Sequence, residues 1–260
     1  MHLTLCVIMT HDFNLRVWNG SRGNVLMVNR IKWTASVCLA LCVICVSGLT
    51  AGAQGRGPWT LESVLRQLDM QDKTFRSLSA DVERTKVTVV VNDHSTENGT
   101  LLVRGDKMLL QMKAPDVRTV LRTGDNLYVY TPGLNRVEEY NLGKNRTMVD
   151  QFLLLGFGTS GKELEKSYLV TLLGEPVLDD KKTVELELTP KSAEARNQIS
   201  KIQIWFDESS WLPVQQQFNE TGSGDYFTIR YSKIVRNPSI GEAEFKPHWP
   251  KGTEKVHPQG

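Results

Sequence analysis

The chain has 260 residues, of which 40% are hydrophobic, and its 31 basic and 29 acidic residues give a net charge of +2 at pH 7. This balance gives no sign of the clustered basic surface that nucleic-acid-binding proteins need, so we expect no nucleic-acid partner. All four cysteines lie within the first 45 residues, which excludes a disulfide, a zinc site or a thiol nucleophile from the rest of the chain.

The amino end has the pattern of a secretory signal peptide. Arg30 and Lys32 precede an apolar run over residues 33–49, and Ala51-Gly52-Ala53 supplies a small-x-small cleavage site. We therefore expect a signal peptide over residues 27–53 that is cleaved near its last residue. An uncleaved anchor is the alternative, because an apolar run of about 17 residues approaches the lower limit for a membrane span.

Two further ranges complete the predicted organisation. Residues 1–26 show no charge pattern, periodicity or caps, so we interpret them as an unstructured, over-extended start, with Met27 as the true first residue. Residues 54–260 are long enough to bury a substantial core, and we expect a single domain there.

The exported part is predicted to begin with a helix that has one apolar stripe. Thr60 is a suitable N-cap, and Glu62 lies in the first turn, where the helix dipole favours a negative charge. Apolar residues follow at helical spacing, namely Leu61, Val64, Leu65 and Leu68. Such a helix needs a sheet to cover.

From residue 78 onward the apolar period is that of strands, in which alternate side chains face opposite ways. Leu127 and Val129, for example, oppose Tyr128 and Tyr130. Residues 92–98 have the composition of a polar turn. Candidate strands cover residues 78–82 and 85–91, three or four runs within 99–132, and residues 136–142, 168–173, 183–188, 201–206, 212–218 and 226–234. Because strands and helices do not alternate, these ten or eleven strands and two or three short helices favour an antiparallel sheet with helices on one side.

The segment 148–158, M-V-D-Q-F-L-L-L-G-F-G, is predicted to form a short helix that is apolar on most sides. Such a helix must be covered on most sides. It is either a core helix or a lid over an apolar cavity, and in the second case the glycines at 156, 158 and 161 would allow it to open.

The glycine-rich stretch from Gly156 to Gly161 matches G-x-G-x-x-G, with Asp179 and Asp180 about 20 residues later, as in dinucleotide-binding proteins. The flanking segments do not form a strand–helix–strand unit, and Asp179-Asp180-Lys181-Lys182 also fits a hairpin turn. We therefore do not expect a dinucleotide site.

Catalytic chemistry has little support in the exported part. Its histidines, His94, His248 and His257, are not associated with a G-x-S-x-G elbow, and no H-E-x-x-H spacing is present. Adjacent carboxylates such as Glu138-Glu139 are typical of a solvated surface. We expect no enzyme activity, no cofactor and no metal site.

Several short motifs, in this order and spacing, resemble the LolA family of periplasmic carriers of outer-membrane lipoproteins. Besides the leading helix they are L-S-A-D-V at 78–82, the strand at 99–104, M-L-L at 108–110 followed by Pro115, T-G-D-N-L-Y-V-Y-T-P at 123–132, and F-K-P to P-K-G at 245–252. The resemblance implies an unclosed antiparallel half β-barrel whose apolar interior holds acyl chains under a helical lid.

The resemblance also implies site residues, with the sequence leaving open which sheet face lines the cavity. Candidate cavity residues are Met108, Leu110, Tyr128, Trp205 and Leu65. Candidate lid residues are Met148, Phe152, Leu154, Leu155 and Phe157. In the family an arginine on an early strand, just before a proline, helps to hold the lid. Arg104 is the candidate for this gate although Gly105 follows it, and Arg118 and Arg122 are the alternatives.

The resemblance further implies partners and a compartment. The cargo would be lipoprotein acyl chains, received from an inner-membrane ABC transporter and passed to an outer-membrane acceptor lipoprotein by a monomer in the periplasm. A protein of the same fold that binds another lipid or glycolipid, or that senses envelope stress, is the alternative, and an exported enzyme that uses residues 156–161 is a third.

Overall fold

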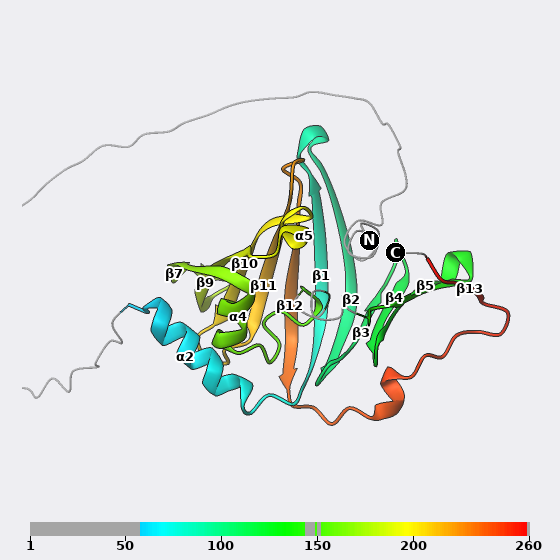
Figure 1. The fold of residues 1–260 in the computed structure, drawn as a ribbon, viewed down its shortest axis with the longest axis horizontal. Coiled ribbons are helices and arrows are strands. Elements are labelled where there is room, and N and C mark those ends of the chain that lie inside the picture. Colours follow the sequence, from blue (N-terminus) through cyan, green and yellow to red (C-terminus); the bar gives the residue numbers. More distant parts are fainter. Residues whose placement is uncertain (1–57, 144–148, 150–151, 259–260) are drawn as a thin grey trace, which may run out of the picture. The chain divides into compact units, whose positions relative to one another are not determined.

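A computed structural model describes residues 58–143, 149 and 152–258 (Figure 1). The predicted start, signal peptide and cleavage site lie outside these residues. Within the described part of the chain, no helix combines the length and the apolar character needed to cross a membrane.

The described residues form an antiparallel sheet that is not closed into a barrel. The strand order is β13-β6-β5-β4-β3-β2-β1-β12-β11-β10-β9-β7, with β8 paired to β9, and only the β13–β6 pair is parallel. This confirms the predicted fold class. The strands are β1 (Ser77–Thr88), β2 (Asp93–Arg104), β3 (Lys107–Met112), β4 (Arg118–Thr123), β5 (Asn126–Thr131), β6 (Arg136–Asn141), β7 (Tyr168–Gly174), β8 (Val177–Leu178), β9 (Lys181–Pro190), β10 (Ile199–Asp207), β11 (Pro213–Glu220), β12 (Tyr226–Arg236) and β13 (Glu254–Val256).

Short helices accompany the sheet. They are α2 (Leu61–Asp72), α4 (Gly161–Ser167), α5 (Ala193–Arg196) and the 3₁₀ turns η1 (Val89–Val91), η2 (Pro132–Leu134) and η4 (Glu242–Phe245). Thr60 caps α2 as predicted and forms a capping box with Ser63, while Ser160 and Glu163 do the same for α4. Helices α2 and α4 lie next to each other beside β9 to β12 (Figure 1).

The two faces of the sheet differ in what covers them. We call the face that packs against α2, Val149 and residues 152–158 the inner face, and the opposite one the outer face. The strand register aligns one row of inner-face residues across β1 to β6: Leu78, Val103, Met108, Arg122, Leu127 and Tyr140. The next row consists of Ala80, Leu101, Leu110, Val120, Val129 and Glu138. The inner face is therefore mostly apolar.

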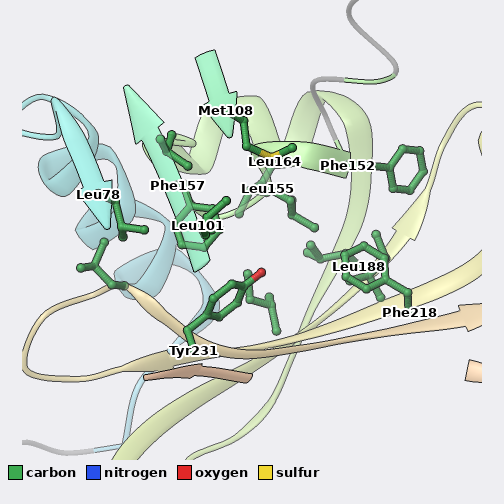
Figure 2. Packing of buried hydrophobic residues seen from close by; sticks show 14 of the residues in the cluster. Leu78, Leu101, Met108, Phe152, Leu155, Phe157, Leu164, Leu188, Phe218 and Tyr231 are labelled. Atoms are coloured by element: carbon green, nitrogen blue, oxygen red, sulfur yellow. The ribbon is translucent and has the colours of Figure 1, made fainter. Parts of the chain in front are cut away.

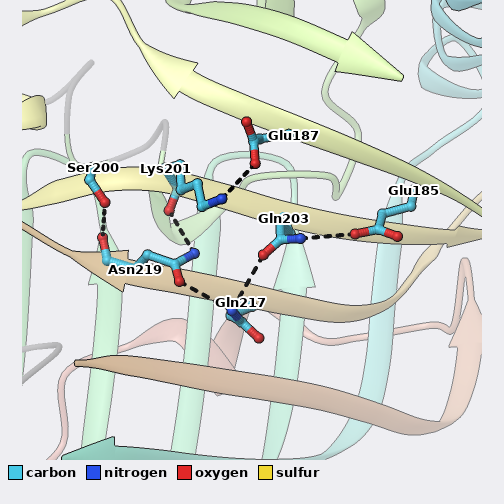
Figure 3. Close-up of polar contacts among 7 residues, drawn as sticks. All are labelled: Glu185, Glu187, Ser200, Lys201, Gln203, Gln217 and Asn219. Atoms are coloured by element: carbon cyan, nitrogen blue, oxygen red, sulfur yellow. Dashed lines mark hydrogen bonds and ion pairs between the residues drawn. The ribbon is translucent and has the colours of Figure 1, made fainter. Parts of the chain in front are cut away.

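The outer face of β9 to β11 carries a chain of polar contacts (Figure 3). Lys201 Nζ donates to Glu187 Oε2 at 2.9 Å, and Gln203 Nε2 donates to Glu185 Oε1 at 2.9 Å. Gln217 Nε2 in turn donates to Gln203 Oε1 at 3.3 Å. Polar side chains that bond to one another along a sheet are suited to solvent, so this half of the outer face needs no cover.

The other half of the outer face is covered by the carboxyl-terminal segment. Phe245 of η4 packs on Leu109 and Leu121, and Trp249 stacks on Tyr130 with 5.1 Å between the ring centroids. Strand β13 then pairs with β6 and extends the sheet edge. Neither η4 nor β13 was predicted from the sequence.

Two local predictions were wrong. Residues 85–91 were expected to be one strand, but β1 ends at Thr88 and Val89 to Val91 form the turn η1. Residues 92–98 were expected to be a turn, but β2 begins at Asp93. Asn92 has the left-handed conformation (φ +49°) that closes this turn, so the hairpin is made by the valines and the polar residues pair as a strand.

Candidate functional site

The inner face forms one continuous apolar cluster with α2 and the lid segment, by which we mean Val149 and residues 152–158 (Figure 2). Val64 and Leu68 of α2 enter the cluster from above the sheet, as does Leu164 of α4. From the sheet itself come Leu101, Met108, Leu188 and other strand residues. The candidate site is this apolar surface together with the elements that cover it.

The lid segment contributes its largest side chains to the cluster. Phe152, Leu155 and Phe157 are 4%, 2% and 4% exposed, and Leu153 and Leu154 pack against the cluster while remaining partly exposed. Val149 is buried as well. The described residues of the lid segment therefore lie against the inner face, and their side chains fill the space beside it.

One buried side chain of the sheet bonds to the backbone of the lid segment. Gln216 on β11 donates from Nε2 to the Leu155 carbonyl oxygen at 2.7 Å. The Tyr231 hydroxyl on β12 donates to Gln216 Oε1 at 2.8 Å, and its ring lies edge-on to Phe157 with 5.1 Å between centroids. Burial raises the pKa of Tyr231, so the hydroxyl stays protonated and able to donate. We call Gln216 and Tyr231 the latch.

The latch was not predicted from the sequence, although a signal was present. Gln216 has the same strand parity as Val214 and Phe218, which are both buried. A glutamine at an apolar position of a strand needs a buried partner, because an unpaired amide inside a protein is costly. That partner is a backbone carbonyl 61 residues away in the chain, which no local pattern identifies.

The lid glycines allow close approach. A Cβ atom built on Gly156 would lie 2.7 Å from Ile204 Cδ1, and one on Gly158 would lie 2.5 Å from Phe75 Cδ1. Both glycines also have positive φ angles, +80° and +71°, which side chains disfavour. Larger residues at either position would push the lid segment away from the sheet or from Phe75.

A small crevice opens where the lid segment meets α2. It is lined by Phe75, Gly158, Trp211, Arg236 and their neighbours, and its enclosed volume is about 10 Å³. This is about the space of one water molecule and far below the roughly 300 Å³ of the smallest ligand pockets.

Arg236 ties the crevice to the end of α2. Its Nη2 donates to the Gln71 carbonyl oxygen at 2.8 Å and to Thr74 Oγ1 at 2.9 Å. A cation at this helix end is favoured by the helix dipole. Burial raises the pKa of nearby Asp72, with the charges of Glu163 and Asp69 adding to the effect.

The predicted gate, Arg104, faces the other way. It lies on the outer face, where Nη1 donates to the Ile240 carbonyl oxygen at 2.8 Å and pairs with Glu242 at 3.2 Å. The prediction that it holds the lid is therefore wrong. The alternatives are both on the inner face: Arg122 is 0% exposed and Arg118 is 7% exposed.

The predicted cavity residues divide between the two faces. Met108 and Leu110 lie on the inner face, and Leu65 is buried where Gly161 packs on its backbone. Tyr128 and Trp205 were expected to line the cavity, and this is wrong. Tyr128 packs under Trp249 on the outer face, and Trp205 has the parity of Gln203 rather than of buried Ile204.

Of the predicted lid residues, the structure describes Phe152, Leu154, Leu155 and Phe157 and places all four against the main cluster. Met148 lies outside the described residues. Within those residues, no group of three or more His, Cys, Asp or Glu side chains is arranged to hold a metal ion. Asp179 and Asp180 form the turn between β8 and β9, with φ angles of +48° and +62°.

Two curated proteins are similar to this chain in sequence over most of its length. An outer-membrane lipoprotein carrier protein of Dechloromonas aromatica is 24% identical over 71% of this chain and 83% of its own length. A protein of the same name from Chromohalobacter salexigens is 25% identical over 88% of this chain and 98% of its own length.

Solved structures are similar at lower sequence identity. An uncharacterised conserved protein of Thermus thermophilus superposes with a TM-score of 0.50 at 10% identity, covering 76% of this chain and 98% of its own. The LolA superfamily protein NE2245 of Nitrosomonas europaea gives a TM-score of 0.39 at 16% identity over 73% of this chain and 98% of its own. A family model described as an uncharacterised protein matches residues 104–240, more than half of the chain. The chain therefore belongs to this family of uncharacterised proteins, and its sequence is similar to those of the two lipoprotein carriers.

Proposed function

We propose that this protein is a carrier of lipoproteins: acyl chains bind to the inner face after the lid segment moves aside, and the protein conveys them across the periplasm from the inner to the outer membrane. The observation that carries the proposal is the construction of the inner face. A wide apolar surface is covered by a short segment whose backbone is held there by the side chain of Gln216.

The free energies of burial are consistent with acyl chains replacing the side chains of the lid segment on the inner face. Burying acyl chains is favourable by about 0.8 kcal/mol per CH₂ group. Removing Phe152, Leu155 and Phe157 from the cluster loses roughly 1.5–3 kcal/mol for each side chain. Chains of a dozen or more carbons therefore offset the displacement of the lid segment, while the empty protein keeps its apolar surface covered.

The curated relatives support the choice of cargo, since both are named outer-membrane lipoprotein carrier proteins rather than enzymes. By the same likeness, we infer an inner-membrane ABC transporter as donor and an outer-membrane acceptor lipoprotein as recipient. Export would depend on the predicted signal peptide over residues 27–53.

Native mass spectrometry of the protein purified from the envelope tests the proposal. We expect complexes with acylated proteins, detected as mass additions and identified by sequencing of the bound polypeptide. Free lipid alone in these complexes would contradict the lipoprotein cargo and keep a lipid carrier. A protein that leaves the envelope without any bound acyl chain, and that takes up none when lipopeptide is added, would overturn the proposal.

A further inference from the structure

Strand β7 forms one edge of the sheet, and within the described part of the chain it pairs only with β9 (Figure 1). The opposite edge is protected, because β13 has only three residues and its first two, Glu254 and Lys255, are charged and exposed. Strand β7 has seven residues, Y-L-V-T-L-L-G, with neither a charge nor a proline among them. Proteins usually protect such an edge, since its backbone groups can pair with another strand. The edge at β7 is therefore open to a partner strand.

The hydrogen bonds to β9 indicate which backbone groups of β7 face this open edge. Lys191 N donates to the Ser167 carbonyl oxygen at 2.9 Å, so the backbone of Ser167 points toward β9. The register between the two strands is regular up to Leu172. Because successive residues point their backbone groups to opposite sides, Thr171 also bonds toward β9. The N–H and C=O groups of Val170 and Leu172 then point to the open edge.

The side chains of β7 are apolar on both faces of the sheet. Val170 and Leu172 pack against the main cluster on the inner face. On the outer face Leu169 and Leu173 are 63% and 47% exposed, and Thr171 is exposed between them. Two exposed leucines together on an edge strand differ from the single apolar residues that are scattered over ordinary surfaces. This combination indicates an interaction surface.

The apolar pattern of β7 matches a second copy of itself. The five residues centred on Thr171 read L-V-T-L-L, which is nearly the same in both directions. When two copies pair as antiparallel strands centred on this residue, Leu169 of one copy lies opposite Leu173 of the other. Val170 likewise lies opposite Leu172, and the backbone groups of these two residues that point to the open edge can bond to each other.

The charges at the two ends of β7 favour the same register. Lys166 near the end of α4 and Glu175 just after β7 are both exposed. A two-fold axis at Thr171 brings Lys166 of one copy beside Glu175 of the other. An axis at Val170 would instead place Glu165 opposite Glu175, and like charges directly opposite each other destabilise a sheet.

We propose that two copies of this protein associate through β7, whose strands pair antiparallel about a two-fold axis at Thr171. Such an interface is isologous, so the same surface of each copy covers the other. One pair of strands buries less than the roughly 1,200 Å² at the lower end of stable interfaces, so the dimer is weak and reversible. The surface lies outside the candidate site, and the inference does not depend on the proposed function.

Sedimentation equilibrium of the exported protein over a range of concentrations measures the association. We expect a monomer–dimer equilibrium with a Kd on the order of 100 μM. Thr171→Lys places two like charges against each other at the axis and should weaken the dimer by about fivefold or more. Thr228→Lys is the matched control, since it makes the same substitution on the outer face of the central strand β12, opposite Gln217, and should leave the Kd within about twofold. Thermal unfolding establishes that each variant is folded.

Disulfide cross-linking tests the register. The native cysteines precede the predicted cleavage site, so Thr171→Cys gives the exported protein a single thiol. At the axis the two copies of this residue form a non-hydrogen-bonded pair with Cα atoms about 4.5 Å apart, within reach of a disulfide. Two copies of Leu169→Cys, on the same face of β7, would lie about 13 Å apart along the strands, too far to be bridged. We expect mild oxidation to link Thr171→Cys into dimers and Leu169→Cys far less.

Three results would overturn the inference. A wild-type protein that remains a monomer at several times the expected Kd, as the family resemblance implies, would exclude a second copy as the partner of β7. Equal weakening by Thr171→Lys and Thr228→Lys would place the contact elsewhere. Equal cross-linking at positions 171 and 169 would indicate random collisions instead of a paired strand. Because none of these results bears on acyl chains, the proposed function would remain to be judged by its own experiment.

Discussion

Replacing Gln216 with Met tests whether the latch controls the lid segment. The substitution keeps the length of the side chain and removes both hydrogen bonds, leaving the Leu155 carbonyl and the Tyr231 hydroxyl without these partners in the closed state. An unsatisfied buried polar group costs roughly 1–3 kcal/mol. Because the carbonyl regains water when the segment opens, the substitution should reduce the free-energy difference that favours the closed state by about the same amount.

The assay is thiol labelling at Phe152→Cys. The four native cysteines precede the predicted cleavage site, so the exported protein carries only the introduced thiol. A shift of 1–3 kcal/mol in the opening equilibrium corresponds to a labelling rate about 5–150 times faster in the Gln216→Met background. Labelling at Leu188→Cys, which lies in the core on β9, reports global unfolding and should change far less.

The matched control is Gln217→Met, the same substitution one residue along β11. Gln217 faces outward, where its amide donates to Gln203 and Asn219. We expect its effect on Phe152→Cys labelling to be within about twofold, because exposed polar contacts contribute little. Equal acceleration by both substitutions, or acceleration by neither, would refute the latch.

Two further predictions concern stability. Gly158→Ala should lower the thermal midpoint more than Gly222→Ala and should open the lid segment in the labelling assay. Both glycines have positive φ angles, but a Cβ atom at Gly158 meets Phe75, whereas a Cβ atom at Gly222 meets nothing within 4 Å. Equal effects on the midpoint would show that Phe75 yields freely. Burial raises the pKa of Tyr168, so the folded form keeps its proton after the unfolded chain begins to release it near pH 10. This contribution to stability is complete below about pH 10 and declines above it. Thermal midpoints measured from pH 9 to 11 should therefore fall less steeply with pH in Tyr168→Phe than in the wild type. The same slope in both proteins would count against the raised pKa.

The periodicity of the sequence predicts most of the sheet, because each strand needs one face apolar. Leu127 and Val129 lie on the opposite face of β5 from Tyr128 and Tyr130, as predicted. The alternation does not say which set faces the interior. Tyr128 is apolar enough for either face, and only the packing of Trp249, some 120 residues later, shows that it lies outside.

The gate prediction was wrong for a related reason. Arg104 was predicted as the gate because it lies near the end of an early strand. Its side chain is on the same face of β2 as that of Leu102, which is the face that η4 covers. Parity counted from Val103, a fully buried neighbour, would have placed Arg104 outside. The latch depends on a contact between β11 and the lid segment. Its only sign in the sequence is a glutamine at an apolar position of a strand.

Acyl chains are proposed to replace the side chains of the lid segment on the inner face. Labelling of Phe152→Cys and of Leu188→Cys with and without a triacylated lipopeptide tests this replacement directly. We expect the lipopeptide to speed labelling at Phe152→Cys while Leu188→Cys remains protected. Binding of the lipopeptide with Phe152→Cys still protected would place the acyl chains elsewhere and contradict the proposed function.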